Sequence, residues 1–463
     1  MDKAIAWLKQ LRKNCSGVEK YARSRMIQAL TTFVRLPAVE QWMIILLAGL
    51  LMISALGIVL PETGVDALWF HLPLTKQILL DPFSTFLPDL YQSTTPRLAS
   101  YLFVLPYAIG EEAGVKLVTF MLGLGVLVLL DRVMRLWKPM PSRPTRLLSL
   151  LIVLSFHTMW WQMTSAYADT LRTVFELLSI WWLFQDSRLS TVLRSGLWFG
   201  LALSTRIVSI VFLPLWFVGA WMLHGLRYAV VWLGVSLLIV SPWYLLAWKD
   251  TGDAFYGWGY TVQDLRTVAG SSILEKMRTQ LPKILETPFL PVVMALDLDL
   301  QSPVILVLAL PLARLMWKDV VGARMKNKKS KRSRKNAMFV FWFFILGYLL
   351  LWILISPRSV RYALTGFVLL AGMMGVAFQS TMISSRITVL AVSILICSLF
   401  LRIAGSSQNF LEYSIVKLQH GNQASAVFVR ERFSTPPLDG IGDRWLSGYW
   451  NVPRGMKPDS VGR

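Results

Sequence analysis

The chain has 463 residues, of which 55% are hydrophobic and only 16% are charged, and its mean hydropathy is +0.53. Soluble domains carry roughly a quarter charged residues, so this composition excludes a soluble globular protein and predicts an integral membrane protein. Apolar runs of about 20 residues recur along the chain, which favours membrane-spanning helices over a barrel. The formal net charge of +21 does not indicate a nucleic-acid partner, because the basic residues lie mostly between the apolar runs.

The basic residues between the apolar runs set the expected orientation, since Lys and Arg in short loops are retained on the cytoplasmic side. Residues 1–41 are predicted to be a basic cytoplasmic tail, and residues 42–403 a membrane domain of about eleven transmembrane helices. This domain has an outer loop of interfacial helices at 61–114, a second outer loop at 249–302 and a basic cytoplasmic loop at 318–336. Residues 404–463 form an outer-side C-terminal tail. The expected spans are 42–60, 115–130, 147–161, 170–184, 192–203, 207–223, 228–248, 303–317, 339–355, 363–378 and 387–403.

The loop at 61–114 concentrates titratable side chains beside the membrane in a chain that is poor in acidic residues. After Asp66, the residues Leu68, Leu72 and Leu79 recur with the spacing of an amphipathic helix that lies on the membrane. Asp66 is either a catalytic carboxylate at the mouth of a membrane cavity or the N-cap of this helix. His71 lies five residues further on and on a different helical face, so it either contacts substrate or sits at the membrane interface.

A second carboxylate, Asp169, opens a later apolar run in the stretch MTSAYADTLRTVFELL. A carboxylate near membrane depth is costly and usually faces a cavity or a partner, so Asp169 is a second candidate for the site. The alternative is a helix cap at a solvated end, with Arg172 as its surface partner.

Arginines between spans on the outer side are the candidate ligands of a phosphate. Arg206, Arg358 and Arg361 are expected on the outer side, whereas Lys and Arg are usually enriched on the cytoplasmic side. Their positions are therefore not explained by membrane topology. A guanidinium group matches a phosphate, whereas the alternative is that these side chains snorkel to lipid headgroups. Sugar transfer from a phosphate leaving group needs a base near the acceptor and positive charge near the departing phosphate. The outer side of this chain is expected to have both.

The order of these motifs resembles the dolichyl-phosphate-mannose protein mannosyltransferase-like family, whose bacterial relatives include the aminoarabinose transferases of lipid A. These are multi-span membrane glycosyltransferases of the C fold (GT-C). Asp66 is similar in position to the family's catalytic aspartate, and Asp169 to a second acidic residue that opens a span. Arg206 stands where the family frequently has a lysine, and Arg361 with Tyr362 resembles a late Arg-Tyr motif. Weaker matches are Pro96, Leu98, Gly110, Pro242, Trp243, Tyr244, Thr251 and Gly252.

The resemblance implies a polyprenyl-phosphate sugar donor that enters from the bilayer and a lipid, glycan or protein acceptor. Asp66 would act as the base for in-line attack on the sugar, and Asp169, the second catalytic candidate, would position a substrate or a cation. The expected donor-phosphate ligands are Arg97, Arg206, Arg358 and Arg361, and the expected substrate contacts are Glu62, His71, Tyr362 and Trp243.

The family's acidic pair in the first outer loop is missing, because Ala67 follows Asp66. The use of a divalent cation, with Asp66 and Asp169 as its ligands, is therefore left open. No other cofactor is expected, and the remaining partners are membrane lipids.

Other functions fit parts of the pattern. A lipid-linked glycan transporter or flippase predicts broken helices in paired repeats and charges near the membrane midplane. A polysaccharide polymerase acting on lipid-linked repeats would also use outer arginines, and an inactive scaffold of a polysaccharide-assembly complex would need neither carboxylate. We expect a hexosyl- or pentosyltransferase of cell-envelope glycans in a bacterial inner membrane, with its site facing the periplasm. The endoplasmic reticulum is the alternative location.

Overall fold

The computed structural model describes residues 33–64, 66–82, 86, 91–137, 140–185, 188–256, 302–320, 332–355, 360–379, 385–425 and 427–428. Every regular element within these ranges is helical, which confirms the all-α fold class. The chain forms two compact units, residues 1–49 and 50–463, and the boundary between them falls inside the helix α2 (Ala38–Ala55). Arg358, most of the loop at 249–302, much of the basic loop at 318–336 and residues 429–463 lie outside the described residues.

The second unit opens with short elements that follow the end of α2. They are the turn η1 (Leu56–Ile58), the π-helical turn η2 (Ala67–His71), the helix α3 (Leu72–Leu80) and the turn η3 (Tyr91–Thr94). The stretch predicted as an interfacial helix is helical, as η2 and α3. On α3 the buried face contains Leu72, Thr75 and Ile78, whereas Leu79 is exposed.

The helix α4 (Leu98–Met134) begins inside the predicted loop at 61–114 and is longer than the predicted span at 115–130. Its backbone leaves helical geometry at Gly110 and Glu111, so α4 consists of two helical segments joined across a kink. A buried apolar cluster joins η2, α3 and α4 to a later helix, α7 (Asp169–Leu183). Leu72, Phe103 and Leu171 are among its members, and each is at most 4% exposed. This cluster fixes the segment that carries Asp66.

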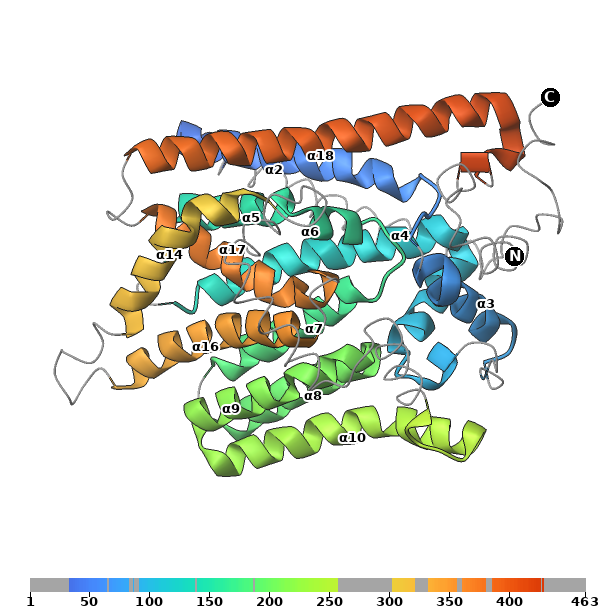
Figure 1. Ribbon diagram of the computed structural model, residues 1–463, viewed down its shortest axis with the longest axis horizontal. Helices are drawn as coiled ribbons and strands as arrows, with labels where there is room; N and C mark the ends of the chain where they lie inside the picture. Colours follow the sequence, from blue (N-terminus) through green and yellow to red (C-terminus); the bar gives the residue numbers. More distant parts are fainter. Residues whose placement is uncertain are drawn as a thin grey trace, which may run out of the picture. The chain divides into compact units, whose positions relative to one another are not determined.

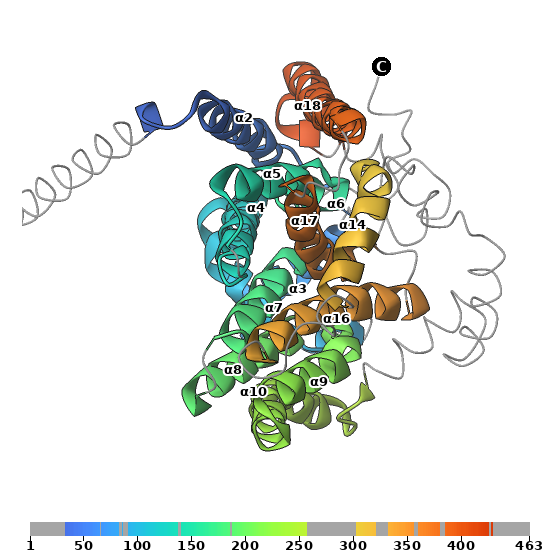
Figure 2. The ribbon, with the colours of Figure 1, turned by 90° about the vertical axis from the view of Figure 1, so that its left-hand side faces the viewer.

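Apart from α18, the remaining helices follow the predicted spans closely. They are α5 (Arg143–Ser155), α6 (His157–Gln162), α7, α8 (Leu189–Thr205), η4 (Ile207–Phe212), α9 (Leu213–His224), α10 (Leu226–Thr251), α14 (Val304–Val320), α16 (Arg332–Ile355), η5 (Val360–Ala363), α17 (Leu364–Gln379), α18 (Ser385–His420) and η6 (Gly421–Gln423). In the second unit, α8 packs between α7 and α10, α7 also packs on α4, and α17 packs on α5 (Figures 1 and 2).

Six helical segments within the described residues are long and apolar enough to cross a membrane. These are Ala38–Ile58, Leu98–Met134, Ile207–His224, Leu226–Thr251, Val360–Phe378 and Arg386–His420. The chain is therefore an integral membrane protein, as predicted, and the count of about eleven spans stays a prediction. Helix α18 does not end at residue 403, as predicted, but continues to His420.

The contact between α8 and α10 depends on glycine. A Cβ atom on Gly200 would lie 2.6 Å from Ile239 Cβ and 2.9 Å from the carbonyl oxygen of Ser236. Gly196 lies one turn earlier, and its carbonyl oxygen accepts a hydrogen bond from Ser236 Oγ. This Gly-x-x-x-Gly spacing lets two helix backbones approach closely, which is how small residues stabilise helix pairs in membranes.

We expect Gly200→Ala to lower the free energy of unfolding by about 1–3 kcal/mol, because the added methyl group overpacks the contact with α10. Gly234→Ala is the matched control, since nothing lies within 4 Å of a Cβ at Gly234, and it should leave stability unchanged or slightly raised. Thermal unfolding in detergent measures both. Equal midpoints for the two variants would contradict the packing described here.

Candidate active site

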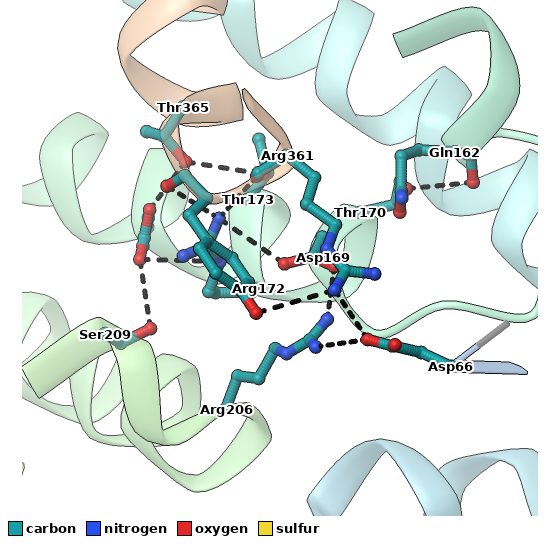
Figure 3. Close-up of polar contacts among 12 residues, drawn as sticks. Asp66, Gln162, Asp169, Thr170, Arg172, Thr173, Arg206, Ser209, Arg361 and Thr365 are labelled. Atoms are coloured by element: carbon teal, nitrogen blue, oxygen red, sulfur yellow. Dashed lines mark hydrogen bonds and ion pairs between the residues drawn. The ribbon is translucent and has the colours of Figure 1, made fainter. Parts of the chain in front are cut away.

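Four charged side chains meet in the second unit (Figure 3). Arg206 bridges two carboxylates, because its Nη2 lies 3.0 Å from Asp66 Oδ2 and its Nη1 donates a short hydrogen bond to Asp169 Oδ2. Arg361 reaches the same oxygen of Asp66, with its Nη2 2.6 Å away. Two negative and two positive groups therefore form one chain of ion pairs without net charge.

Each of these side chains stands at the end of a helix. Asp66 precedes η2 and Asp169 is the first residue of α7, whereas Arg206 separates α8 from η4 and Arg361 lies in η5. Asp66 and Arg206 are 140 residues apart in the sequence. The negative charge of Asp169 in the first turn of α7 is favourable there, since the amino-terminal end of a helix is partially positive. The fold thus brings together four helix ends that carry opposite charges.

The two carboxylates, Asp66 and Asp169, differ in their exposure to solvent. The side chain of Asp169 is fully buried, whereas that of Asp66 is 17% exposed. Arg206 and Arg361 are also partly exposed, at 12% and 16%. A ligand can therefore touch Asp66 and both guanidinium groups, and Asp169 lies behind them.

Asp66 is held as a carboxylate. Burial alone would raise its pKa, but the positive charges of Arg361 and Arg206 outweigh burial and bring the pKa below its ordinary value. Its side chain makes no capping hydrogen bond to η2, so the alternative that Asp66 is only an N-cap is wrong. The backbone N–H of Asp66 donates to the hydroxyl oxygen of Tyr167, 3.2 Å away, which fixes the start of η2.

His71 is buried beside the charged group. The sequence period places it on another face from Asp66, but η2 is a π-helical turn in which the N–H of Leu72 donates to the carbonyl oxygen of Ala67. Its ring lies 4.1 Å from the ring of Phe70, centre to centre. Burial, together with the charge of Arg206, holds the pKa of His71 well below its ordinary value, although Asp66 opposes this. His71 Nε2 has no hydrogen-bond partner in the described part of the chain.

Two tyrosines lie under the guanidinium groups. The guanidinium carbons of Arg206 and Arg361 lie 5.3 and 5.2 Å from the ring centre of Tyr362. Arg361 also lies 5.0 Å from the ring centre of Tyr167. These are cation–π distances, so the aromatic faces add to the ion pairs in orienting both arginines. Tyr362 was predicted from its motif, whereas Tyr167 was not.

Sequence reasoning missed a second layer of polar residues on α7. The alternative for Asp169 made Arg172 its surface partner, but the Arg172 side chain is fully buried and its Nη2 lies 3.6 Å from Asp169 Oδ1. Glu176 is fully buried too. The signal was available in the sequence, because Asp169, Arg172 and Glu176 have the i, i+3 and i+7 spacing of one helix face.

Glu62 anchors the segment before η2. Its Oε1 accepts hydrogen bonds from the backbone N–H of Gly64 and from Ser165 Oγ, at 2.8 and 3.0 Å. Its Oε2 accepts a hydrogen bond from the backbone N–H of Ala166. Both oxygens are engaged with the protein, so this geometry supports a role in holding the chain next to α7. Its predicted contact with substrate stays a prediction.

Arg97 and Trp243 meet at a third residue, Tyr101. The Trp243 ring centre lies 5.6 Å from that of Tyr101. Arg97 interacts with Tyr101 through a hydrogen bond and with Asp250 through charge, while burial lowers the pKa of Arg97. The ion pairs of Asp66 are made by Arg206 and Arg361 instead. Phosphate binding by Arg97 and Arg358 and substrate binding by Trp243 stay predictions.

The two carboxylates considered as ligands of a divalent cation are bridged by a guanidinium group instead. A dication between Asp66 and Asp169 would meet the fixed charge of Arg206, which already lies within hydrogen-bond distance of both. No group of three or more His, Cys, Asp or Glu side chains suited to a metal ion occurs among the described residues. This arrangement therefore does not fit a metal ion between the two aspartates.

We expect Arg206→Met to lower the free energy of unfolding by about 3 kcal/mol, because the buried Asp169 loses its closest cation. Adding Asp169→Asn to the same chain should recover part of that loss, since an amide carries no charge to compensate. Unfolding of wild type, both single variants and the double variant completes the cycle. A double variant that loses the sum of the two single effects would show that the pair is not coupled.

Stability should also depend on pH through His71. Its folded pKa lies below the ordinary value of about 6.5, so under this pH the unfolded chain binds a proton that the folded chain does not. Stability therefore falls as the pH drops from about 6.5 towards the folded pKa, by up to about 1.4 kcal/mol per pH unit. His71→Gln should reduce this loss over an interval of about two pH units, from about pH 7.5 to 5.5. Stability curves that coincide for wild type and His71→Gln over this range would refute the assignment.

The comparisons with known proteins come from structure alone. A scan of protein-family models and a search of curated protein sequences both return no match. The structure is similar to ArnT from Cupriavidus metallidurans bound to undecaprenyl phosphate, with a TM-score of 0.54 and 13% identity over 85% of this chain and 78% of that chain. The apo state of that ArnT gives a TM-score of 0.50 at 12% identity, with the same coverage.

A second similar protein is the oligosaccharyltransferase of Archaeoglobus fulgidus in its complex with Zn and sulfate. The TM-score is 0.50 and the identity 13%, over 90% of this chain but only 58% of the larger protein. At this level of identity the likeness concerns the fold. The chain has the GT-C fold that the resemblance of its motifs predicted.

Proposed function

We propose that this protein transfers a sugar from a polyprenyl-phosphate donor to an acceptor at the outer face of the membrane. One observation carries the proposal: Asp66, a partly exposed carboxylate, lies within hydrogen-bond distance of two partly exposed guanidinium groups, Arg206 and Arg361. A carboxylate can take a proton from the acceptor, and the guanidinium groups can bind the phosphate that leaves. Few other reactions at a membrane need both groups at one point.

In the proposed step, an oxygen or nitrogen of the acceptor attacks the anomeric carbon of the sugar in line. The bond from the acceptor to that carbon forms as the bond from the carbon to the phosphate oxygen breaks, and the lipid phosphate leaves with the electron pair. Asp66 receives the proton that the acceptor loses. Arg206 and Arg361 stabilise the negative charge that grows on the phosphate oxygen, which is where preorganised positive charge is most effective.

The depressed pKa of Asp66 suits a base that must be ionised before reaction. Because the pKa lies below the ordinary value, protonation of Asp66 does not limit the rate between about pH 5 and 8. Asp169 takes a different role from Asp66 in this proposal. It is fully buried and holds Arg206, so it positions the cation rather than touching the acceptor.

The remaining predicted residues extend this site. Tyr362 lies against both arginines, and His71 offers a neutral ring nitrogen beside the base, so both are proposed to contact the sugar. Arg97 and Arg358 are proposed as further phosphate ligands. The fold supports the proposal, because a similar ArnT structure contains undecaprenyl phosphate. The bacterial inner membrane and a periplasmic site belong to the proposal, as does a lipid, glycan or protein acceptor.

The resting charge of the site has a consequence for donor binding. Asp66 and the donor phosphate compete for the same guanidinium groups, because Arg206 and Arg361 both pair with Asp66 Oδ2. A bound phosphate is therefore expected to weaken at least one of these ion pairs. With less positive charge close to it, Asp66 becomes a stronger base once the donor is in place.

The first experiment is transfer of radiolabelled sugar from polyprenyl-phosphate donors by the purified protein. Asp66→Asn should lower the transfer rate by about two to four powers of ten, because the amide cannot take the proton. A chelator should leave the wild-type rate unchanged, since no step depends on a metal between the aspartates.

Binding of undecaprenyl phosphate provides the control for this variant. Asp66→Asn should bind the lipid phosphate more tightly than wild type, because it removes the competing carboxylate. Weaker binding by Asp66→Asn would contradict the competition. Absence of transfer with every donor, together with movement of donor lipid across vesicles that Asp66→Asn does not affect, would favour a transporter. Joining of lipid-linked repeats into a polymer would favour a polymerase.

A further inference from the structure

A row of buried polar side chains runs along one face of α7 behind the charged site (Figure 3). Asp169, Arg172, Thr173 and Glu176 occupy positions i, i+3, i+4 and i+7, and all four are fully buried. Asp169 at the start of the row holds Arg206. Glu176 lies about 10 Å further along the helix, at 1.5 Å per residue. Ionisable side chains at such depth in a membrane protein are costly and usually have a function.

Arg172 connects α7 to the turn that carries Arg361. Its Nη2 donates hydrogen bonds to the backbone carbonyl oxygens of Arg361 and Tyr362, at 2.9 and 3.0 Å. Both acceptors belong to η5. A guanidinium group that holds two successive carbonyl oxygens fixes the orientation of the turn, so Arg172 sets the direction in which the Arg361 side chain leaves the backbone.

Glu176 connects α7 to both arginine-bearing segments. Its Oε1 accepts a hydrogen bond from Ser209 Oγ, at 3.2 Å, and Ser209 lies in η4, three residues after Arg206. Its Oε2 accepts hydrogen bonds from Thr365 Oγ1, at 2.5 Å, and from Tyr348 OH, at 2.8 Å. Thr365 lies in the first turn of α17, just after η5. One carboxylate therefore links the segments that present Arg206 and Arg361.

We propose that Arg172 and Glu176 are positioning residues that set the separation of Arg206 and Arg361 and so determine how tightly the site binds a lipid phosphate. This inference rests on the proposed function. The two arginines come from turns far apart in the sequence, and the described contacts join both turns to α7 through these two side chains. Neither Arg172 nor Glu176 is exposed, so they act through Arg361 and Arg206 and do not touch the donor.

The chemistry of the pair argues against a purely stabilising role. Arg172 Nε lies 4.0 Å from Glu176 Oε1, which is the limit of an ion pair, and neither Nε nor Nη1 of Arg172 has a hydrogen-bond partner among the described residues. Well-packed apolar side chains often stabilise a protein more than a buried ion pair of this kind. The hydrogen bonds that Arg172 and Glu176 do make lead to η5, η4 and α17.

The test measures the dissociation constant of undecaprenyl phosphate, the KM for the sugar donor and the KM for the acceptor. Arg172→Met should weaken lipid-phosphate binding and raise the donor KM by about tenfold or more, because two hydrogen bonds from a charged group to η5 are lost. The acceptor KM should not change. Thr365→Val, which keeps the shape and removes one hydrogen bond to Glu176, should have a smaller effect in the same direction.

A matched control separates positioning from general stability. Ser195→Ala removes buried hydrogen bonds between α7, α8 and α10, because Ser195 Oγ donates to the carbonyl oxygen of Ser179 and accepts from Trp232 Nε1. It touches neither η4 nor η5, so it should leave the lipid-phosphate affinity unchanged even where it lowers the unfolding midpoint. If Arg172→Met does not fold, Thr365→Val carries the comparison.

A double variant decides whether Arg172 acts through Arg361. In an Arg361→Ala background, Arg172→Met, or Thr365→Val in its place, should weaken lipid-phosphate binding less than twofold further, a difference of about 0.4 kcal/mol. A full additional loss in that background would overturn the inference, as would unchanged affinity in both single variants. Failure of wild type to bind undecaprenyl phosphate would instead overturn the proposed function.

Discussion

The guanidinium group of Arg206 is shared between a buried carboxylate and an accessible one, and the rest of the site depends on this sharing. Asp169 is fully buried and pairs with Arg206, so it holds this guanidinium group in place at the junction of α8 and η4. Arg206 in turn fixes the position of Asp66, whose other cation, Arg361, comes from the turn before α17. Four helix ends are thereby locked together by charge at a point where hydrophobic packing alone would not specify side-chain directions.

The polar face of α7 explains why this helix lies inside the bundle. Arg172 and Glu176 would be costly on a lipid-facing helix, because hydrocarbon offers them no hydrogen-bond partner. Helix α7 is therefore surrounded by α4, α8 and α17, and its other face packs on the apolar cluster with η2 and α4. The spacing of Asp169, Arg172 and Glu176 on α7 therefore has two consequences. It requires this face of the helix to be buried, and it places the arginines of the candidate site.

The helices and the principal charged residues could be predicted from the sequence, because long apolar runs are typical of membrane helices and the charged residues between such runs are few. Asp66, Asp169, Arg206 and Arg361 converge as those motifs suggested. The position of His71 could not be predicted, since a regular helical period does not allow for the π-helical turn in η2. The burial of Arg172 could not be predicted either, because an arginine three positions after an aspartate has the same sequence pattern whether the helix end is solvated or covered. Only tertiary packing decides that question.

The length of α18 determines what a thiol probe would report. Its 36 residues extend for about 54 Å, well beyond the hydrocarbon core of about 30 Å. Ser406 accepts a hydrogen bond from Trp160 Nε1, at the level of α6, so the segment from there to His420 rises about 20 Å further. Cys397 is exposed on the same helix, about 13 Å below Ser406. Single thiol labels placed along α18, beginning with the exposed Cys397, would therefore show which part of this helix lies in the hydrocarbon core and which part extends beyond it.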